Sequence, residues 1–135
     1  MLEVEDAGKL ISARLRLADG FLEIGESERA REHAMGVHDL SLELSEHQLH
    51  ARSRVILGRY YARTKDSELS LLHYNAALET FSEEANPTNA VETEMLLGQV
   101  LVDVGRTSEA SEHYLDALSI ACLLYTSPSP RDRIA

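Results

Sequence analysis

Basic side chains without acidic neighbours lie in the middle of the sequence, where Arg and Lys occupy five positions from His50 to Lys65. Arg52, Arg59 and Arg63 are seven and four residues apart, so in a helix their side chains share one face. Guanidinium groups bind carboxylates through two parallel hydrogen bonds, so this face is suited to an acidic peptide. The alternative is a solvated face whose arginines pair with Glu and Asp of the same chain and contribute little.

Two groups of residues have side chains that could bind a metal ion. The first group is Glu43, Glu46, His47 and His50. Its spacings can place two ligands on one side of a helix, but the sequence offers no clear third ligand. The second group is His33, His73 and His113. These histidines recur at equal intervals, which indicates duplication, and stacked helices would hold them too far apart to share one ion. We therefore predict no metal site and no cofactor.

Motifs of known catalytic chemistry are absent from the sequence. There is no glycine-rich phosphate loop, no GxSxG elbow and no HExxH helix. The single cysteine, Cys122, lies in a C-terminal segment of different composition, so we do not assign it as a nucleophile. We predict that the chain is not an enzyme.

Three segments align at an interval of 40 residues and predict the elements that carry these side chains. In each copy a leucine precedes a small residue, and an apolar or aromatic residue follows. After a break comes a hydroxyl that could cap a second helix, which carries another small residue. The aligned sets are Leu17, Leu57 and Leu97; Ala18, Gly58 and Gly98; Phe21, Tyr61 and Leu101; Gly25, Lys65 and Gly105; Ser27, Ser67 and Thr107; Ala30, Ser70 and Ala110; Ala34, Tyr74 and Tyr114.

This pattern resembles the tetratricopeptide repeat (TPR), whose signature is LGxxY, then AxxxF, then a proline. The matching residues are Leu57, Gly58 and Tyr61, then Ala110 and Tyr114, with Pro87 between the second and third copies. The resemblance covers roughly residues 11–121 and implies an all-α fold, a right-handed solenoid of three helix-turn-helix repeats with about six antiparallel helices. The usual period is about 34 residues, so the helices should be longer than usual.

The predicted TPR-like domain spans residues 1–121, with repeats at approximately 8–45, 46–86 and 87–121. Within it we expect helices over 10–24, 27–44, 47–64, 67–84, 88–104 and 108–123. Gly98 interrupts an apolar run, where glycine costs about 1 kcal/mol relative to alanine. In the resembled family the small residues of the two helices face each other. We therefore expect the pairs Gly98 with Ala110, Gly58 with Ser70 and Ala18 with Ala30, and burial of Leu97, Leu101, Tyr114 and Leu118 around the first pair.

The resemblance also implies a concave groove lined by the first helix of each repeat. Its residues would be Ser12, Leu15, Asp19, Leu22 and Glu23; Arg52, Val55, Arg59, Ala62 and Arg63; Glu92, Met95, Gln99, Val102 and Asp103. Among these, Asp19, Arg52, Arg59, Arg63, Met95 and Gln99 are the candidate partner-binding residues. We expect charge reversal at Arg59 to weaken the binding of an acidic peptide.

Composition limits the classes of partner. A chain of 135 residues has the length of one domain, and its 44% hydrophobic and 27% charged residues are usual for a globular protein. A net charge of −10 argues against nucleic-acid binding. No apolar window reaches the length of about 18 residues that spans a membrane, and a single cysteine suits a reducing, cytoplasmic compartment.

The segment CLLYTSPSPRD at residues 122–132 resembles a translated sequencing adapter. We expect residues 122–135 to be a non-native tail, disordered or continuing the last helix, on a fragment truncated at about residue 121; a genuine Pro/Ser linker is the alternative. The leading functional hypothesis is a scaffold that binds a partner protein or peptide in its groove. The alternative hypothesis is the regulatory or sensory arm of a larger bacterial signalling or transcription-regulating protein.

Overall fold

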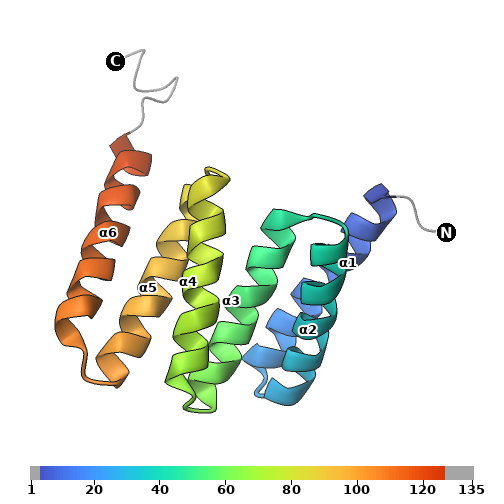
Figure 1. Ribbon diagram of the computed structural model, residues 1–135, viewed down its shortest axis with the longest axis horizontal. Helices are drawn as coiled ribbons and strands as arrows, with labels where there is room; N and C mark the ends of the chain where they lie inside the picture. Colours follow the sequence, from blue (N-terminus) through green and yellow to red (C-terminus); the bar gives the residue numbers. More distant parts are fainter. Residues whose placement is uncertain (1–3, 127–135) are drawn as a thin grey trace.

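Six α-helices joined by short turns make up the chain in the computed structural model, which describes residues 4–126 (Figure 1). The helices are α1 (Val4–Glu23), α2 (Ser27–Glu43), α3 (His47–Arg63), α4 (Ser67–Glu83), α5 (Pro87–Asp103) and α6 (Thr107–Thr126). They form three hairpins, α1/α2, α3/α4 and α5/α6, and no strand occurs between residues 4 and 126. The predicted all-α repeat fold is confirmed.

The turns between successive helices have one common geometry. A residue with positive φ follows each helix from α1 to α5, and the next N–H donates to the carbonyl five residues back, as from Asn86 to Phe81 at 2.8 Å. This is the hydrogen bond of the Schellman motif, which closes the C-terminal end of a helix. The positive-φ residues are Gly25, Ser45, Lys65, Ala85 and Gly105. Since these residues recur at equal intervals, each helix from α3 to α6 begins at the same distance in sequence from the start of the one before it.

The expected hydroxyl caps are wrong by one position. Ser27, Ser67 and Thr107 are the first helical residues, and the residue before each adopts the non-helical backbone of an N-cap or turn. In α4 the carboxylate of Asp66 accepts from the N–H of Leu69 at 3.3 Å. The turn geometry causes the difference, because the residue after the positive-φ position is the one placed beside the open N–H groups.

Helix boundaries agree with expectation for α2 to α5 within one residue and differ at the two ends of the chain. α1 begins at Val4 instead of residue 10, and Ala7 in this added part is buried. α6 continues past residue 123 to Thr126, because no glycine or proline interrupts it there. Residues 122–126 therefore extend the last helix, while the rest of the expected tail lies outside the described residues. None of the helices described is long and apolar enough to cross a membrane.

The helices form two layers. The odd-numbered helices contact one another along the stack, α1 with α3 and α3 with α5, whereas no such contact joins α2, α4 and α6 within residues 4–126. The odd-numbered layer is therefore the more closely spaced side of the stack. Figure 1 shows the hairpins in chain order along the length of the molecule.

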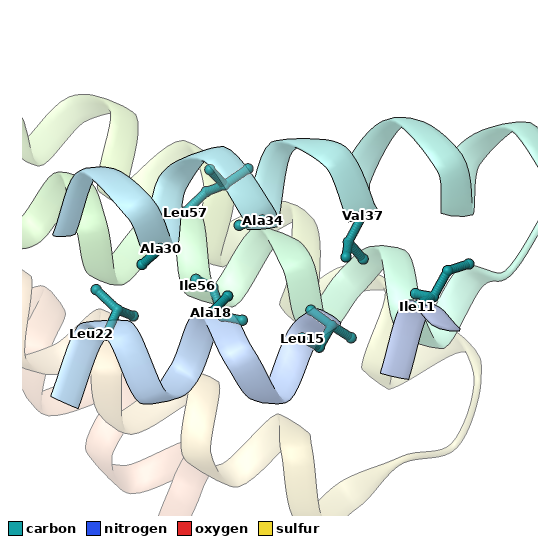
Figure 2. Packing of buried hydrophobic residues seen from close by; sticks show 9 residues of the cluster. All are labelled: Ile11, Leu15, Ala18, Leu22, Ala30, Ala34, Val37, Ile56 and Leu57. Carbon is teal, nitrogen blue, oxygen red and sulfur yellow. The ribbon is translucent and has the colours of Figure 1, made fainter. Parts of the chain in front are cut away.

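The hydrophobic core of the first hairpin continues into the second (Figure 2). Its fully or nearly fully buried residues are Ile11, Leu15, Ala18 and Leu22 from α1, Ala30, Ala34 and Val37 from α2, and Ile56 and Leu57 from α3. Burial of each large aliphatic side chain stabilises the fold by about 1.5–3 kcal/mol. The same core thus holds the first hairpin together and joins it to α3.

The helical glycines make room for tyrosine rings as well as for a short side chain. A Cβ on Gly58 would lie 2.5 Å from the ring of Tyr74, and a Cβ on Gly98 would lie 2.6 Å from that of Tyr114. Ser70 also lies against Gly58, since its hydroxyl donates to the Gly58 carbonyl at 2.8 Å. The first hairpin has alanine at both equivalent places, Ala18 and Ala34. The expected pairing of small residues is therefore incomplete, because the ring four residues later is what a Cβ would strike.

Three residues expected in the core are more than one-third exposed. The exposed fractions are 46% for Leu17, 37% for Tyr114 and 59% for Leu118. Leu57, which is equivalent to Leu17, is buried because α3 packs against the preceding hairpin. Within residues 4–126, α1 has no preceding hairpin and α6 has no following one. The other expected packing residues are buried, as Leu97, Leu101 and Ala110 are, or partly buried like Phe21 and Tyr61.

We predict that Gly58→Ala destabilises the protein by about 1–3 kcal/mol, because the fully buried ring of Tyr74 cannot move away from the new methyl group. Gly98→Ala should destabilise less, since Tyr114 is partly exposed and can turn toward solvent. Urea unfolding followed by circular dichroism measures both. An equal effect of the two substitutions would contradict this packing account.

We predict that Ala85→Gly stabilises the protein by about 0.5–1 kcal/mol, because a φ of 53° is unfavourable for a residue with a Cβ. Thermal unfolding measures the change. Gly105→Ala is the matched reverse substitution, at a φ of 84°, and should destabilise. A decrease in stability for Ala85→Gly would show that the turn conformation carries no strain.

Candidate functional site

A groove of about 610 Å³ lies mainly between α3 and α5. Its lining residues are Asp19 from α1; Arg52, Val55, Ile56 and Arg59 from α3; Phe81 from α4; and Asn89, Glu92, Thr93, Met95, Leu96 and Gln99 from α5. The odd-numbered helices supply almost all of this surface because the repeat turns the same face of each helix to the same side. The groove therefore combines apolar side chains, two carboxamides and charges of both signs.

Most of the candidate partner-binding residues come together in this groove. Asp19, Arg52, Arg59, Met95 and Gln99 all line it, and the side chain of Met95 is 52% exposed. Asp19, Arg59 and Gln99 occupy equivalent positions on α1, α3 and α5, so the repeat places them in one row. Arg63 does not line the groove, because its guanidinium donates to the carbonyl of Leu22.

Other residues expected in the groove lie elsewhere. Leu15 and Leu22 are fully buried in the core of the first hairpin, so the expectation that they face a partner is wrong. Ala62 and Asp103 line a separate depression of about 90 Å³. Asn89, Thr93 and Leu96 are lining residues that sequence reasoning missed. Their spacings of three and four residues on one predicted helix are the signal that could have found them.

Arg59 is paired within the chain. Its guanidinium contacts the carboxylate of Asp19 at 3.0 Å and that of Glu23 at 3.2 Å. These ion pairs join α3 to α1, and Arg63 joins the same two helices through Leu22. For Arg59 the alternative of pairing with acidic residues of the same chain is therefore the one that the structure shows.

Arg52 differs from Arg59 because no carboxylate within residues 4–126 lies at salt-bridge distance from its guanidinium. The equivalent position on α5 is Glu92, which also lines the groove. An ion pair thus closes the space between α1 and α3, whereas the corresponding space between α3 and α5 is open. Val55, Met95 and Leu96 give this open space an apolar wall.

The three equivalent histidines have separate surroundings. His33 stacks on Phe21 with ring centroids 5.6 Å apart, and His73 stacks on Tyr61 with centroids 5.5 Å apart. Each ring therefore packs within its own hairpin. In the third hairpin Leu101 stands where the other two have an aromatic residue, and His113 contacts Glu94 instead.

The second histidine group forms a packed junction between α2 and α3. The His50 ring lies 4.4 Å from that of His38, and its Nδ1 faces the hydroxyl of Ser41 at 3.4 Å. Burial lowers the pKa of His50, and the nearby side chains of His38 and Arg54 lower it further. Glu43 and Glu46 do not join His47 and His50 in any group of potential metal ligands within residues 4–126.

We predict that acid destabilises the protein partly through His73. Burial lowers its pKa from the usual 6.5 to about 4, and the charges of Arg54 and His38 act in the same direction. The unfolded chain therefore takes up a proton below pH 6.5 that the folded chain binds only near pH 4, so stability falls as the pH decreases across this window. Between pH 7.5 and 5 the wild type should lose about 1 kcal/mol more than His73→Gln in urea unfolding, since partial exposure reduces the full linkage effect. Equal losses in the two proteins would contradict the assignment.

The crystal structure of the TPR domain of Arabidopsis FLU is similar to this chain, with a TM-score of 0.76 and 15% sequence identity. The superposition covers 84% of this chain and 95% of the FLU domain. No family model and no curated protein sequence matches the chain. Because the identity is low, the similarity extends to the fold. The chain therefore has the TPR fold, in three hairpins with an open groove between α3 and α5.

Proposed function

We propose that this chain is a protein-interaction module that binds a peptide segment of a partner in the groove between α3 and α5. The observation that supports it most directly is Arg52, which has no carboxylate partner within residues 4–126, beside the exposed Met95 in a groove of about 610 Å³. Binding sites usually combine an apolar surface with a few polar groups that orient the ligand. Almost all of this surface belongs to the odd-numbered helices.

Two features of the groove favour a peptide over a small polar ligand. Met95 and Leu96 offer contact to an apolar side chain, and the exposed part of Met95 loses contact with water when it is covered. Asn89 and Gln99 carry carboxamides that can donate to and accept from a peptide backbone. An extended chain or a short helix would satisfy both requirements at once.

We expect the bound segment to supply a carboxylate that pairs with Arg52. A guanidinium that is not yet paired can form two parallel hydrogen bonds with Asp or Glu. The net charge of −10 repels a polyacidic partner, however, so the bound segment should carry one acidic residue flanked by apolar ones. The acidic partner expected from the sequence is thus replaced by a segment with a single carboxylate, which contacts Arg52.

Peptides selected from a random display library on the wild-type chain provide the test. They should contain Asp or Glu beside apolar residues. In fluorescence anisotropy, binding should weaken at least tenfold with Arg52→Glu and also with Met95→Asp. Arg16→Glu is the matched control because Arg16 is exposed on α1 outside the groove and its reversal changes the net charge equally.

Equal affinities of the wild type and Arg52→Glu for the selected peptides would overturn the proposal. Raising the salt concentration should weaken wild-type binding more than binding by Arg52→Glu, since the variant lacks the ion pair. Arg59→Glu is less informative than Arg52→Glu, because it also removes the ion pairs to Asp19 and Glu23.

A further inference from the structure

One place in the hairpins brings together a residue of the first helix and two of the second. In the first hairpin, the Arg14 Nε donates to the Nδ1 of His33 at 3.3 Å. The same guanidinium packs against Gly36, since a Cβ on this glycine would lie 2.7 Å from the Nη1 of Arg14. Positions 14, 33 and 36 thus meet at one point between α1 and α2.

The third hairpin has opposite charges at this place. The residues equivalent to Arg14, His33 and Gly36 are Glu94, His113 and Asp116, whereas the second hairpin has Arg54, His73 and Ala76. The histidine is therefore common to all three hairpins. Only the third replaces the arginine and the small residue by two carboxylates.

These three side chains are already close together. The carboxylate of Glu94 lies 2.5 Å from the Nδ1 of His113, and one ligand atom from each of Glu94, His113 and Asp116 lies within 4.8 Å of the others. Ligand atoms around a tetrahedral ion with bonds of about 2.1 Å are separated by about 3.4 Å. Small side-chain rotations would therefore be sufficient to bind an ion.

We propose that Glu94, His113 and Asp116 bind a divalent transition-metal ion of the Zn²⁺ class between α5 and α6. One imidazole nitrogen and two carboxylate oxygens are a donor set that Zn²⁺ accepts, whereas Mg²⁺ and Ca²⁺ prefer oxygen ligands alone. The Glu94 side chain is only 8% exposed, so little water competes for it, and the exposed Asp116 leaves the site open to solvent on one side. Water completes the coordination there.

Nearby charges leave the trio available. Glu109 lies close enough to His113 to interact with it, but its carboxylate is held by the guanidinium of Arg106 at 2.6 and 2.9 Å. Arg106 is therefore engaged with Glu109. A bound ion would join α5 to α6 and stabilise this hairpin, because it binds the folded chain in preference to the unfolded one.

Titration calorimetry with Zn²⁺ on the chelator-treated chain tests the proposal. We expect one ion per chain, a rise in the melting temperature, and no comparable effect of Mg²⁺. Asp116→Asn should fold as the wild type does, because Asp116 is exposed, and should reduce the Zn²⁺ affinity at least tenfold. His47→Gln is the matched control, since it removes an exposed histidine from the unrelated group and should leave the affinity unchanged.

Two further measurements distinguish this site from weak binding at surface histidines. Binding should weaken as the pH decreases, because protons compete with the metal ion for imidazole and carboxylate ligands. Substituting Arg14→Glu and Gly36→Asp together in the first hairpin should add a second ion per chain.

Equal Zn²⁺ affinity in the wild type and Asp116→Asn, or a loss of affinity with His47→Gln, would overturn the proposal. This outcome is independent of the peptide groove, which shares no residue with the trio.

Discussion

The turn between successive helices is the constraint on which the rest of this protein depends. Each turn reverses the chain with one positive-φ residue and the same set of backbone hydrogen bonds, as at Ala85 and Asn86. The four helices α2 to α5 all have 17 residues, so the same turn repeats every side-chain direction after 40 residues. Arg59 consequently meets Asp19, and Glu94 occupies the place that Arg14 occupies in the first hairpin. Function can then vary through the side chains that occupy equivalent places on an unchanged backbone.

Comparison of equivalent places explains why the groove lies between α3 and α5. Between α1 and α3, Arg59 binds two carboxylates and closes the surface. The corresponding position on α5 is Gln99, which donates to Asp103 of its own helix at 3.0 Å and forms no bond to α3. The α3–α5 surface thus lacks the ion pairs that join α1 to α3, because Gln99 stands in the place of Arg59, and Arg59 and Arg63 stand in the places of the carboxylates of Asp19 and Glu23. Packing follows the same rule. Gly58 and Gly98 occur where a tyrosine ring faces the helix, and Ala18 occurs at the equivalent position where no ring does.

The sequence was sufficient to predict features that follow from the repeat. It was insufficient for features that depend on which side chains and hairpins contact one another. The interval of 40 residues predicts the helices, the turns and the face that carries Arg52, Arg59 and Met95. It does not reveal that Arg59 binds Asp19, because a long arginine side chain can reach several acidic residues and only the helix spacing selects among them. It also assigns equal burial to Leu17 and Leu57, although burial depends on a neighbouring hairpin that α1 lacks in residues 4–126. The Glu94 trio was missed because its members differ in type from their equivalents, and a search for repeated residues passes over such differences.

The arginines of α3 have two different roles. Arg59 and Arg63 hold α3 against α1, and a carboxylate from a partner could reach Arg59 only by displacing Asp19 or Glu23. Such an exchange replaces one ion pair by another and yields little net free energy, whereas binding at Arg52 forms a new pair. Affinity for a carboxylate should therefore concentrate at Arg52, and the stability of the α1–α3 contact should be largely independent of the bound peptide. A bound partner would accordingly leave the contact between α1 and α3 intact.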